Sequence, residues 1–269
     1  MKRIYLEITD ACNLDCPFCT YEKGNRFMSY EKIADYLGQI SPYCSYIYLH
    51  ILGEPLLHPD FDRILDLLDE LKMHLQLVTN GTLLDSHLGL LDHPCLRKLS
   101  ISLHSIGGVD TSGDYFKTID RLIETDRKTT VELRFYDPEH LDGKLKEYLK
   151  KLNEAYPFTA TAKKNSFRIR ENTYVYFEEL FSWPKITDPE IGGSGTCRGA
   201  LDMLGITVDS RVTLCCLDPL AYNAIGSLEE STFAQIIGSD KYKKHVQEFK
   251  AHKISSPLCR RCSYRLRFR

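Results

Sequence analysis

Three cysteines within eight residues constrain this chain more than any other feature. Cys12, Cys16 and Cys19 follow residues 4–9, in which apolar and polar side chains alternate. Such alternation predicts a β-strand, so the cysteines lie on the loop that leaves its C-terminal end. Three thiolates on one short loop can hold three corners of a cubane iron–sulfur cluster. The fourth iron then has no protein ligand and is open to another molecule.

A zinc knuckle or a set of buried thiols without a metal would be the structural alternatives. Zinc usually takes four ligands in two close pairs, and this triplet has no fourth Cys or His nearby. The sequence therefore favours an iron–sulfur cluster.

The composition is that of a globular protein rather than a membrane or nucleic-acid-binding one. The 269 residues are 43% hydrophobic and 27% charged, with a formal net charge of -2. No apolar run approaches the ~20 residues of a membrane span, and the first residues lack a secretory signal pattern. Ten cysteines, three of them in one tight motif, fit metal-bound thiolates in a reducing cytosol better than disulfides. We therefore expect a cytoplasmic protein that uses neither a membrane nor nucleic acid.

Strands and helices alternate through the first 160 residues. After the first strand, further strands are predicted at 46–51, 75–79, 99–103, 131–135 and 174–177. Helices are predicted after a Ser29 cap and at 60–71, 83–91, 115–125 and 141–155. This alternation predicts βαβ units and a parallel sheet, as a partial barrel or as a doubly wound sheet.

The C-terminal part has a different pattern and a second set of cysteines. Residues 181–196 predict a connecting segment, 203–215 a β-hairpin with a two-residue turn at 209–210, and 240–251 a helix. The second set of thiols flanks the hairpin and closes the chain: Cys197, Cys215, Cys259 and Cys262. Four thiolates saturate a metal site, which could be zinc or a [4Fe–4S] cluster. Cys216 could replace Cys215 as a ligand.

The first motif, with the aromatic Phe18 directly before its third cysteine, resembles that of the radical S-adenosylmethionine (SAM) superfamily. The resemblance implies a partial (β/α)6 barrel that is open on one side. It also implies that the open iron binds the amino and carboxylate groups of SAM. One electron from the reduced cluster then cleaves SAM, and the resulting 5′-deoxyadenosyl radical abstracts hydrogen from a substrate.

The second set of cysteines is similar to the SPASM/twitch extensions of radical SAM enzymes. Residues 205–209 and 215–218 carry this resemblance. It implies a small α+β domain with a hairpin and a helix, and one auxiliary [4Fe–4S] cluster, because only Cys216 remains once four cysteines are used. We expect a barrel at 1–180, a linker at 181–196 and an auxiliary-cluster domain at 197–269.

Polar residues at the predicted strand ends give the candidate contacts to SAM. Gly53 and Glu54 resemble the superfamily's glycine–glutamate motif, although Leu52 stands where its first glycine usually is. The resemblance implies that Phe18 packs on the adenine and that Ser102 contacts the ribose, and a guanidinium such as Arg134 suits a carboxylate. The full set of candidates is Phe18, Gly53, Glu54, Asn80, Ser102 and Arg134. A plain turn and polar residues that line the barrel with structural hydrogen bonds are the alternatives.

Three further residues could face the substrate, although none is assigned a catalytic role. His50 and His104 fall near strand ends, and Glu7 alternates with the apolar residues of the first strand. A single histidine is more often a satisfied core residue than a catalyst. Five arginines occupy the last eleven residues, and we interpret them as a solvated terminus whose charge balances an iron–sulfur site rather than as an RNA-binding tail.

The cofactors expected are therefore SAM and two [4Fe–4S] clusters. A fully ligated auxiliary cluster suits the acceptance of an electron, so we expect an oxidative modification of a sugar, an aminocyclitol or a ribosomal peptide. A flavodoxin or ferredoxin would supply electrons. The alternatives are a tRNA- or rRNA-modifying radical SAM enzyme and a non-catalytic zinc or iron–sulfur protein associated with RNA.

Overall fold

One mixed sheet runs through both halves of the chain. The computed structural model describes residues 1–16, 18–19, 21–106, 114–136, 141, 143–159, 165–179 and 181–268. Six neighbouring strands are parallel: β1 (Arg3–Leu6), β2 (Tyr46–Tyr48), β3 (His74–Thr79), β4 (Leu96–Ser102), β5 (Thr130–Tyr136) and β7 (Thr173–Glu178). An antiparallel edge strand, β6 (Ser166–Arg170), pairs with β7. The parallel strands confirm the predicted α/β class.

The other end of the sheet comes from the C-terminal part. Its strands are β8 (Met203–Ile206), β9 (Arg211–Thr213) and β10 (Gly226–Ser227). β8 is parallel to β1, whereas β9 and β10 continue the sheet antiparallel. The strand order is β10-β9-β8-β1-β2-β3-β4-β5-β7-β6, so the sheet does not close into a full barrel.

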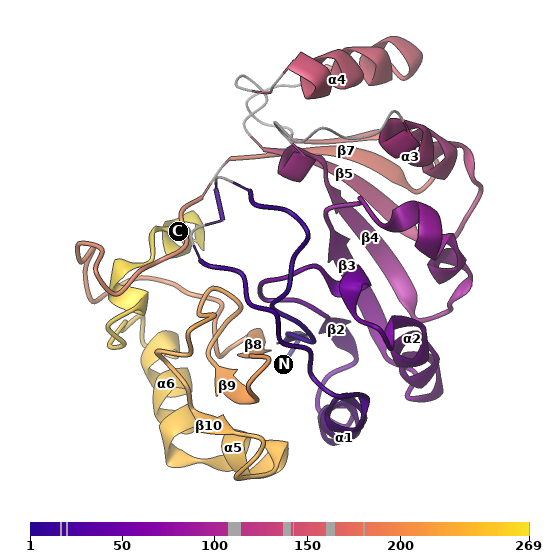
Figure 1. Ribbon diagram of the computed structural model, residues 1–269. Coiled ribbons are helices and arrows are strands. Elements are labelled where there is room, and N and C mark those ends of the chain that lie inside the picture. The colour runs from indigo at the N-terminus through magenta and orange to yellow at the C-terminus, as the bar shows by residue number, and fades with distance from the viewer. Residues whose placement is uncertain are drawn as a thin grey trace.

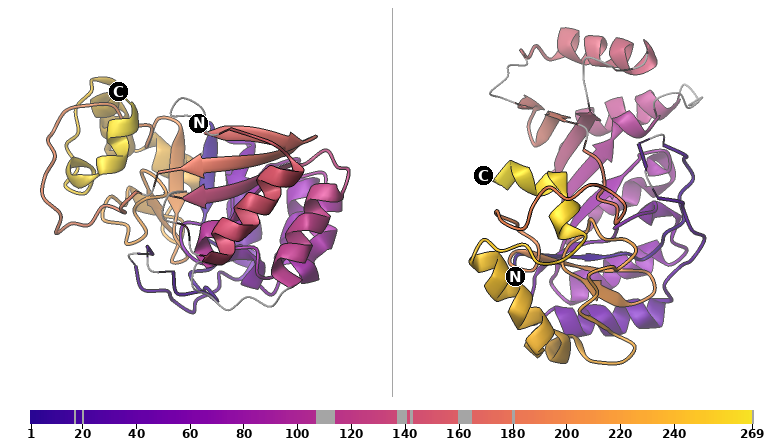
Figure 2. Two further views of the ribbon diagram at one scale, coloured as in Figure 1. Left: turned by 90° about the horizontal axis from the view of Figure 1, so that it is seen from above. Right: turned by 90° about the vertical axis from the view of Figure 1, so that its left-hand side faces the viewer.

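Helices pack against one face of this sheet (Figures 1 and 2). They are α1 (Tyr30–Ile40), α2 (Phe61–Glu70), α3 (Asp114–Glu124) and α4 (Gly143–Ala155), and two more, α5 (Phe233–Gly238) and α6 (Asp240–Lys250), belong to the C-terminal part. Short 3₁₀ segments lie at Pro55–Leu57, Leu84–Asp92, Leu103–Ile106, Cys259–Arg261 and Ser263–Phe268. None of the described helices is long and apolar enough to cross a membrane.

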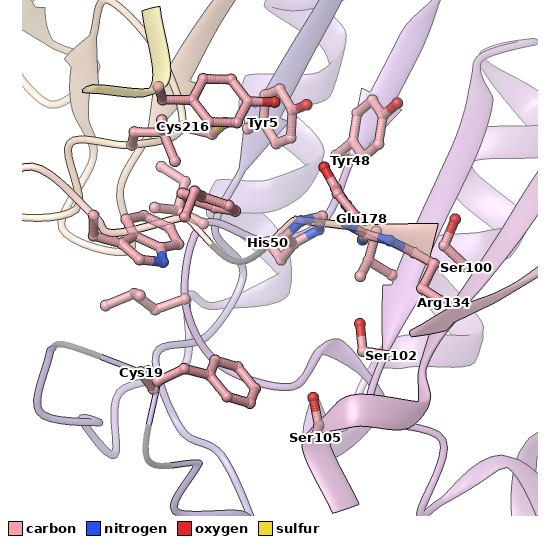
Figure 3. Close-up of a pocket in the computed structure, with 18 of the residues that line it drawn as sticks. Tyr5, Cys19, Tyr48, His50, Ser100, Ser102, Ser105, Arg134, Glu178 and Cys216 are labelled. Carbon is pink, nitrogen blue, oxygen red and sulfur yellow. Dashed lines mark hydrogen bonds and ion pairs between the residues drawn. The ribbon is translucent and has the colours of Figure 1, made fainter. Parts of the chain in front are cut away.

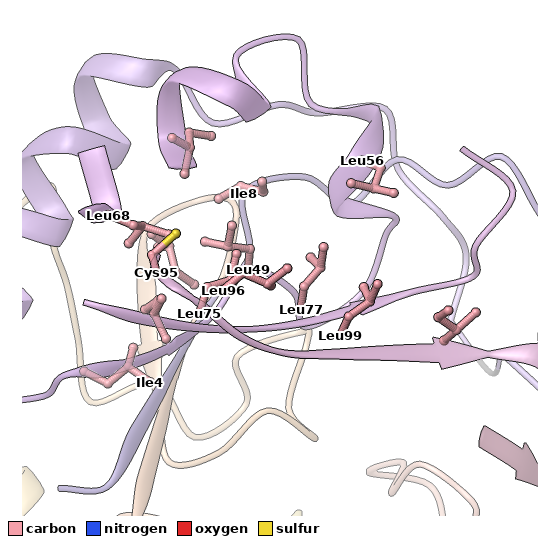
Figure 4. Close-up of a cluster of buried hydrophobic side chains, with 14 of the residues drawn as sticks. Ile4, Ile8, Leu49, Leu56, Leu68, Leu75, Leu77, Cys95, Leu96 and Leu99 are labelled. Carbon is pink, nitrogen blue, oxygen red and sulfur yellow. The ribbon is translucent and has the colours of Figure 1, made fainter. Parts of the chain in front are cut away.

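The two faces of the sheet differ in chemistry because side chains alternate along each strand. On β3, Leu75 and Leu77 are fully buried and join the core under the helices (Figure 4). On α1, Ser29 accepts a hydrogen bond from the Lys32 N–H, and Ile33 and Leu37 are buried. The opposite face of the strands carries polar and aromatic side chains. That face forms the wall of the cavity described below.

Most predicted elements are present, with differences at the ends and in the hairpin. The segment predicted at 83–91 is a 3₁₀ segment with a kink at His87, and β2 ends at Tyr48 rather than at residue 51. The prediction of a two-residue turn in the hairpin was wrong. The Ser210 N–H donates to the Thr207 carbonyl and the Thr207 N–H to the Arg211 carbonyl, so the loop has three residues and Ser210 has a φ of 68°. Strands β6 and β10 and helix α5 were not predicted.

Candidate active site

A single cavity of about 800 Å³ lies against the polar face of the sheet. Both sets of cysteines contribute to its lining: Cys12, Cys16 and Cys19 from the loop after β1, and Cys197, Cys215, Cys216 and Cys262 from the C-terminal part. Cys259 is buried, with 7% of its surface exposed. Cys19 and Cys216 lie at opposite ends of the pocket (Figure 3). The fold thus brings the two predicted metal sites to one chamber.

The loop after β1 carries the first three cysteines. The Cys19 N–H donates to the Cys16 carbonyl at 2.9 Å, and Cys16 Sγ lies 3.5 Å from the Ser105 carbonyl. Burial raises the pKa of Cys16 to about 11 and also raises that of Cys12. Both thiols therefore hold their protons at neutral pH until a metal binds and displaces them. Three soft ligands on one loop, with no histidine or carboxylate among them, suit an iron–sulfur cluster with an open corner.

Both carboxylate oxygens of Glu54 are occupied by hydrogen bonds from the end of β3. Its Oε1 accepts from Thr79 Oγ1 at 2.8 Å, and its Oε2 accepts from the Asn80 N–H at 2.7 Å. Only 2% of Glu54 is exposed, and burial raises its pKa to about 7. Asn80 Nδ2 in turn donates to Asn13 Oδ1 at 2.9 Å, inside the cysteine loop. Glu54 and Asn80 therefore link the end of β3 to the cysteine loop, and both also line the cavity.

Residue 53 has to be a glycine because it packs closely against the backbone that follows β1. Its φ is 74°, and an added Cβ would lie 2.3 Å from the Thr9 carbonyl oxygen and 2.9 Å from that of Ala11. The next N–H, that of Glu54, donates to the Ala11 carbonyl at 2.8 Å. The glycine thus lets residues 52–54 pack directly on the strand that leads into the cysteine loop.

We expect Gly53→Ala to lower the free energy of unfolding by about 1–3 kcal/mol, the usual cost of a non-glycine residue in a disfavoured backbone region. Urea denaturation at equal iron content measures the change. Gly89→Ala is the matched control, because a Cβ at that exposed position meets nothing within 4 Å. Equal losses in the two variants would contradict the assignment.

The wall formed by β4, β5 and the residues after them holds two of the predicted SAM contacts, and Phe18 of the cysteine loop packs against it. Ser102 is 8% exposed and lines the cavity. Arg134 lines it too, but its Nη2 already contacts Glu178 Oε2 at 2.5 Å and Tyr136 Oη at 2.8 Å. Phe18 joins an aromatic group with His104 and Tyr136, in which the last two rings stack at 3.7 Å. Phe18, Ser102 and Arg134 therefore line one chamber.

The two candidate histidines are held in their neutral form. Burial lowers the pKa of His104 to about 3, and its Nδ1 lies 3.3 Å from the Arg134 carbonyl. Burial and the nearby charge of Arg134 lower the pKa of His50 to about 4. His50 packs edge-on against the stacked rings of Tyr5 and Tyr48, and within the described residues its buried Nδ1 has no hydrogen-bond partner. His50 is thus a neutral polar group at the chamber wall (Figure 3).

Glu7 has a supporting geometry instead of a catalytic one, because it is not among the residues that line the cavity. Its Oε1 accepts from the Leu52 N–H and its Oε2 from the Val208 N–H, both at 2.8 Å. The carboxylate therefore joins β1, the loop that contains Gly53, and the C-terminal hairpin. Burial raises its pKa to about 7, although the two hydrogen bonds act in the opposite direction.

The raised pKa of Glu7 gives a testable pH dependence. The folded carboxyl holds its proton more tightly than the unfolded one, whose pKa has the ordinary value of 4.5. The contribution of Glu7 to the free energy of unfolding is therefore present below pH 4.5 and falls as pH rises towards 7. We expect Glu7→Gln to remove this part, so that the difference in unfolding free energy between wild type and variant changes between about pH 5 and pH 7. Parallel urea-denaturation curves across that range would contradict it.

The C-terminal thiols surround a second position. The Gly199 N–H donates to Cys197 Sγ at 3.3 Å, and an added Cβ at Gly199 would lie 3.4 Å from Cys215 Cβ and 3.5 Å from Cys197 Sγ. Asn223 Nδ2 donates to Cys259 Sγ at 3.6 Å. Cys216 instead lies near Tyr5, whose hydroxyl acts to lower the pKa of the Cys216 thiol. Cys215 thus lies against Cys197, whereas Cys216 contacts the barrel wall.

The spacing of these four thiols favours a cluster over a single zinc ion. Any two sulfurs bound to one zinc lie at most about 4.6 Å apart, because each Zn–S bond is about 2.3 Å long. Among the residues that the structure describes, no three of the four thiols lie within 4.8 Å of one another. A cluster of several irons fits this wider arrangement better.

Two cysteines lie outside both predicted metal sites. Cys44 and Cys95 are buried, as the sequence predicts. The Asp69 carboxylate contacts both the Cys95 N–H and the His93 ring. These hydrogen bonds hold the three residues together. Sequence reasoning missed the ion pairs Lys98–Glu132 and Arg134–Glu178 on the chamber wall. The alternation of Glu132 and Arg134 with apolar residues along β5 could have indicated one member of each pair.

Two family models match the chain. The model of the radical SAM superfamily matches residues 6–133, which include the first three cysteines and β2 to β4. The model described as an iron–sulfur cluster-binding domain, SPASM, matches residues 197–263, which include all four cysteines of the second site. The chain belongs to the radical SAM superfamily. It carries a C-terminal SPASM domain, and the superfamily comprises enzymes.

Individual relatives of this radical SAM protein cover parts of it or share only its fold. It is 28% identical to a GTP 3′,8-cyclase of Synechocystis sp. over 112 residues, which make up 39% of this chain and 34% of the cyclase. The matches span only a quarter to about a third of the length of its curated relatives.

Among solved structures, BtrN in complex with AdoMet and 2-DOIA is 19% identical, with a TM-score of 0.63, over 97% of this chain and 92% of that one. The enzyme anSMEcpe with bound AdoMet and the Kp18Cys peptide is 14% identical, with a TM-score of 0.61, over 96% and 88%. At these identities the likeness shows the fold alone.

Proposed function

We propose that this protein is a radical SAM enzyme that carries out a net oxidation of a small polar molecule. Cys12, Cys16 and Cys19 would hold the SAM-binding [4Fe–4S] cluster. The four cysteines of the SPASM domain would hold one auxiliary [4Fe–4S] cluster. The observation that carries the proposal is that both cysteine sets border one cavity, in which a substrate can lie between them.

The chain's own residues position the cofactor and exclude water from it. The Glu54 and Asn80 contacts fix the cysteine loop relative to β3, and residues 52–54 form the cavity wall beside that loop. Phe18 would pack on the adenine and Ser102 would contact the ribose; both line the cavity. Arg134 would have to share its guanidinium between Glu178 and the carboxylate of SAM. A fork of five N–H donors leaves that possible.

The bound cofactors supply a 5′-deoxyadenosyl radical that takes hydrogen from the substrate, and an auxiliary cluster that accepts one electron. Neutral His50 lies on the chamber wall with a nitrogen that lacks a hydrogen-bond partner among the described residues. It would bind a substrate hydroxyl or amine there. The external electron donor would be of the flavodoxin or ferredoxin class.

The size and lining of the cavity support a small polar substrate. Sites of about 300–1,000 Å³ hold one drug-sized ligand, and this cavity of about 800 Å³ must also hold SAM. The wall carries hydroxyl, imidazole and paired charged groups, which suit a molecule rich in hydroxyls or amines, such as a sugar or an aminocyclitol. The BtrN structure, which holds AdoMet together with 2-DOIA, has the same fold and is consistent with such a substrate.

A peptide is the second candidate. The fold match to anSMEcpe with a bound peptide favours it, because one side chain of a peptide could enter a chamber of this size. The two candidates differ in how much of the substrate must enter the cavity.

The test is anaerobic reconstitution followed by measurement of 5′-deoxyadenosine release and of products by mass spectrometry. A panel of aminocyclitols and amino sugars is compared with a panel of Ser- and Cys-containing peptides. We expect one panel to stimulate 5′-deoxyadenosine release and to yield a product two mass units lighter. Products that incorporate hydrogen without net oxidation would contradict the oxidative assignment, and no SAM cleavage with either panel from an iron-replete protein would count against the activity.

A further inference from the structure

One arginine of the C-terminal tail differs from its neighbours in burial. Arg265 is 4% exposed. The side chains of Arg260, Arg261 and Arg267 are 37%, 20% and 31% exposed. Arg260, Arg261 and Arg267 are thus partly exposed, whereas Arg265 is buried; Arg269, the fifth arginine of the tail, lies outside the described residues.

The hydrogen bonds of Arg265 all go to uncharged acceptors. Its Nε donates to the Cys259 carbonyl at 3.1 Å, Nη1 to the Ser194 carbonyl at 2.8 Å, and Nη2 to the Gly192 carbonyl at 2.7 Å. These carbonyls satisfy the donors but leave the positive charge in place.

The other arginines of the tail have carboxylate partners. Arg260 and Arg261 pair with Glu190, and Arg267 pairs with Glu178. No carboxylate within the described residues forms such a pair with Arg265. A buried guanidinium without a counter-charge is costly, so a negative group is expected beside it.

The auxiliary site supplies that negative group. Arg265 lines the cavity together with Cys197 and Cys262, and its Nε binds the carbonyl of Cys259, a third cysteine of this set. Burial raises the pKa of both thiols, and the charge of Arg265 acts in the opposite direction. Four thiolates around a [4Fe–4S] core with a charge of about +2 leave the cluster negative overall. The cation and the cluster therefore complement each other.

The same charge acts on electron transfer. When the cluster takes up an electron, its negative charge increases, so a fixed cation nearby stabilises the reduced form more than the oxidised form. Hydrogen bonds to cluster sulfurs and exclusion of solvent also set the reduction potential of iron–sulfur clusters. Arg265 provides a buried positive charge at this site.

We propose that Arg265 raises the reduction potential of the auxiliary cluster and thereby makes it an acceptor for the electron that the substrate radical loses. This rests on the proposed [4Fe–4S] assignment. In that step the substrate radical loses one electron to the cluster and one proton to solvent. The cluster then passes the electron to a one-electron carrier of the flavodoxin or ferredoxin class. Arg265 is a positioning and tuning residue, because it touches no reacting atom.

The test is a redox titration of the auxiliary cluster, followed by electron paramagnetic resonance. The full-length chain with Cys12, Cys16 and Cys19 replaced by alanine isolates that cluster. In this background we expect Arg265→Gln to lower the equilibrium constant for one-electron reduction at least tenfold, a shift of about 59 mV to more negative potential. Arg265→Lys keeps the charge and should shift the potential less. Arg260→Gln removes an exposed, paired charge from the same tail and should leave the potential unchanged.

A second variant covers the case in which Arg265→Gln loses its cluster. Ser194 has an exposed side chain and a carbonyl that accepts from Arg265. Ser194→Asp would add a negative charge on the residue whose carbonyl binds the guanidinium, without removing any of the hydrogen bonds of Arg265, and should also lower the potential. An unchanged potential in Ser194→Asp, or in an iron-replete Arg265→Gln variant, would overturn the inference. Zinc instead of iron at this site would overturn the proposed function. Analysis of iron and zinc content detects that outcome independently of the potential.

Discussion

Replacing Cys12, Cys16 and Cys19 together by alanine should abolish SAM cleavage and halve the iron content of the reconstituted protein. We expect about eight irons per chain in the wild type and about four in the variant, because one [4Fe–4S] cluster is lost and the other is untouched. Cys19, one of the three, lies at the opposite end of the cavity from Cys216 (Figure 3). Their loss should therefore leave the SPASM domain folded. Iron and sulfide analysis, with 5′-deoxyadenosine release driven by dithionite, measures both effects.

The matched control for the triple variant is Cys44→Ala combined with Cys95→Ala. Both thiols are buried away from the cavity lining, so this variant should keep the full iron content. Residual SAM cleavage in the triple variant would contradict the assignment of the SAM site. Loss of all iron would mean that the two sites do not assemble independently.

Alanine variants of the adjacent residues Cys215 and Cys216 should differ in iron content. We expect Cys215→Ala to lose about four irons and all product formation while it still cleaves SAM. Cys216→Ala should keep about eight irons. The physical reason is that Cys215 lies with Cys197 around Gly199, whereas Cys216 lies near Tyr5 of β1.

Iron content and the electron paramagnetic resonance spectrum of the two single variants decide this question. The opposite result, in which Cys216→Ala loses the iron, would make Cys216 the ligand and Cys215 the spare thiol. Equal iron loss in both variants would show that the adjacent cysteines depend on each other. Product formation needs the substrate, but the iron count does not.

Local patterns in the sequence predicted the parallel part of the sheet well. The apolar residues of β3 and β5 alternate regularly, and Ser29 is a typical cap for α1, so these elements could be located from neighbouring residues alone. β6 and β10 were missed because short edge strands depend on pairing with distant residues, as β6 does with β7. The hairpin loop was assigned one residue too few because Ser210, not a glycine, takes the positive φ.

The site was predictable in its ligands and less so in its supports. The cysteine spacing gives the two thiol sets directly, because metal ligation depends on residue type and separation. The partners of Glu7 are the N–H groups of Leu52 and Val208, and the second lies 201 positions away. Such contacts arise only when the fold is complete. The same holds for Arg265, whose burial distinguishes it from arginines that look equivalent in the sequence.

The parallel pairing of β8 with β1 fixes how the two halves of the enzyme can move. Four successive register pairs join these strands, from Arg3 with Met203 to Leu6 with Ile206, and the Glu7 N–H extends the ladder to the Ile206 carbonyl. A hinge opening between the halves would have to break this run of hydrogen bonds. The distance between the two cysteine sets is therefore set by the fold itself. Entry of substrate has to rely on loops rather than on separation of the domains.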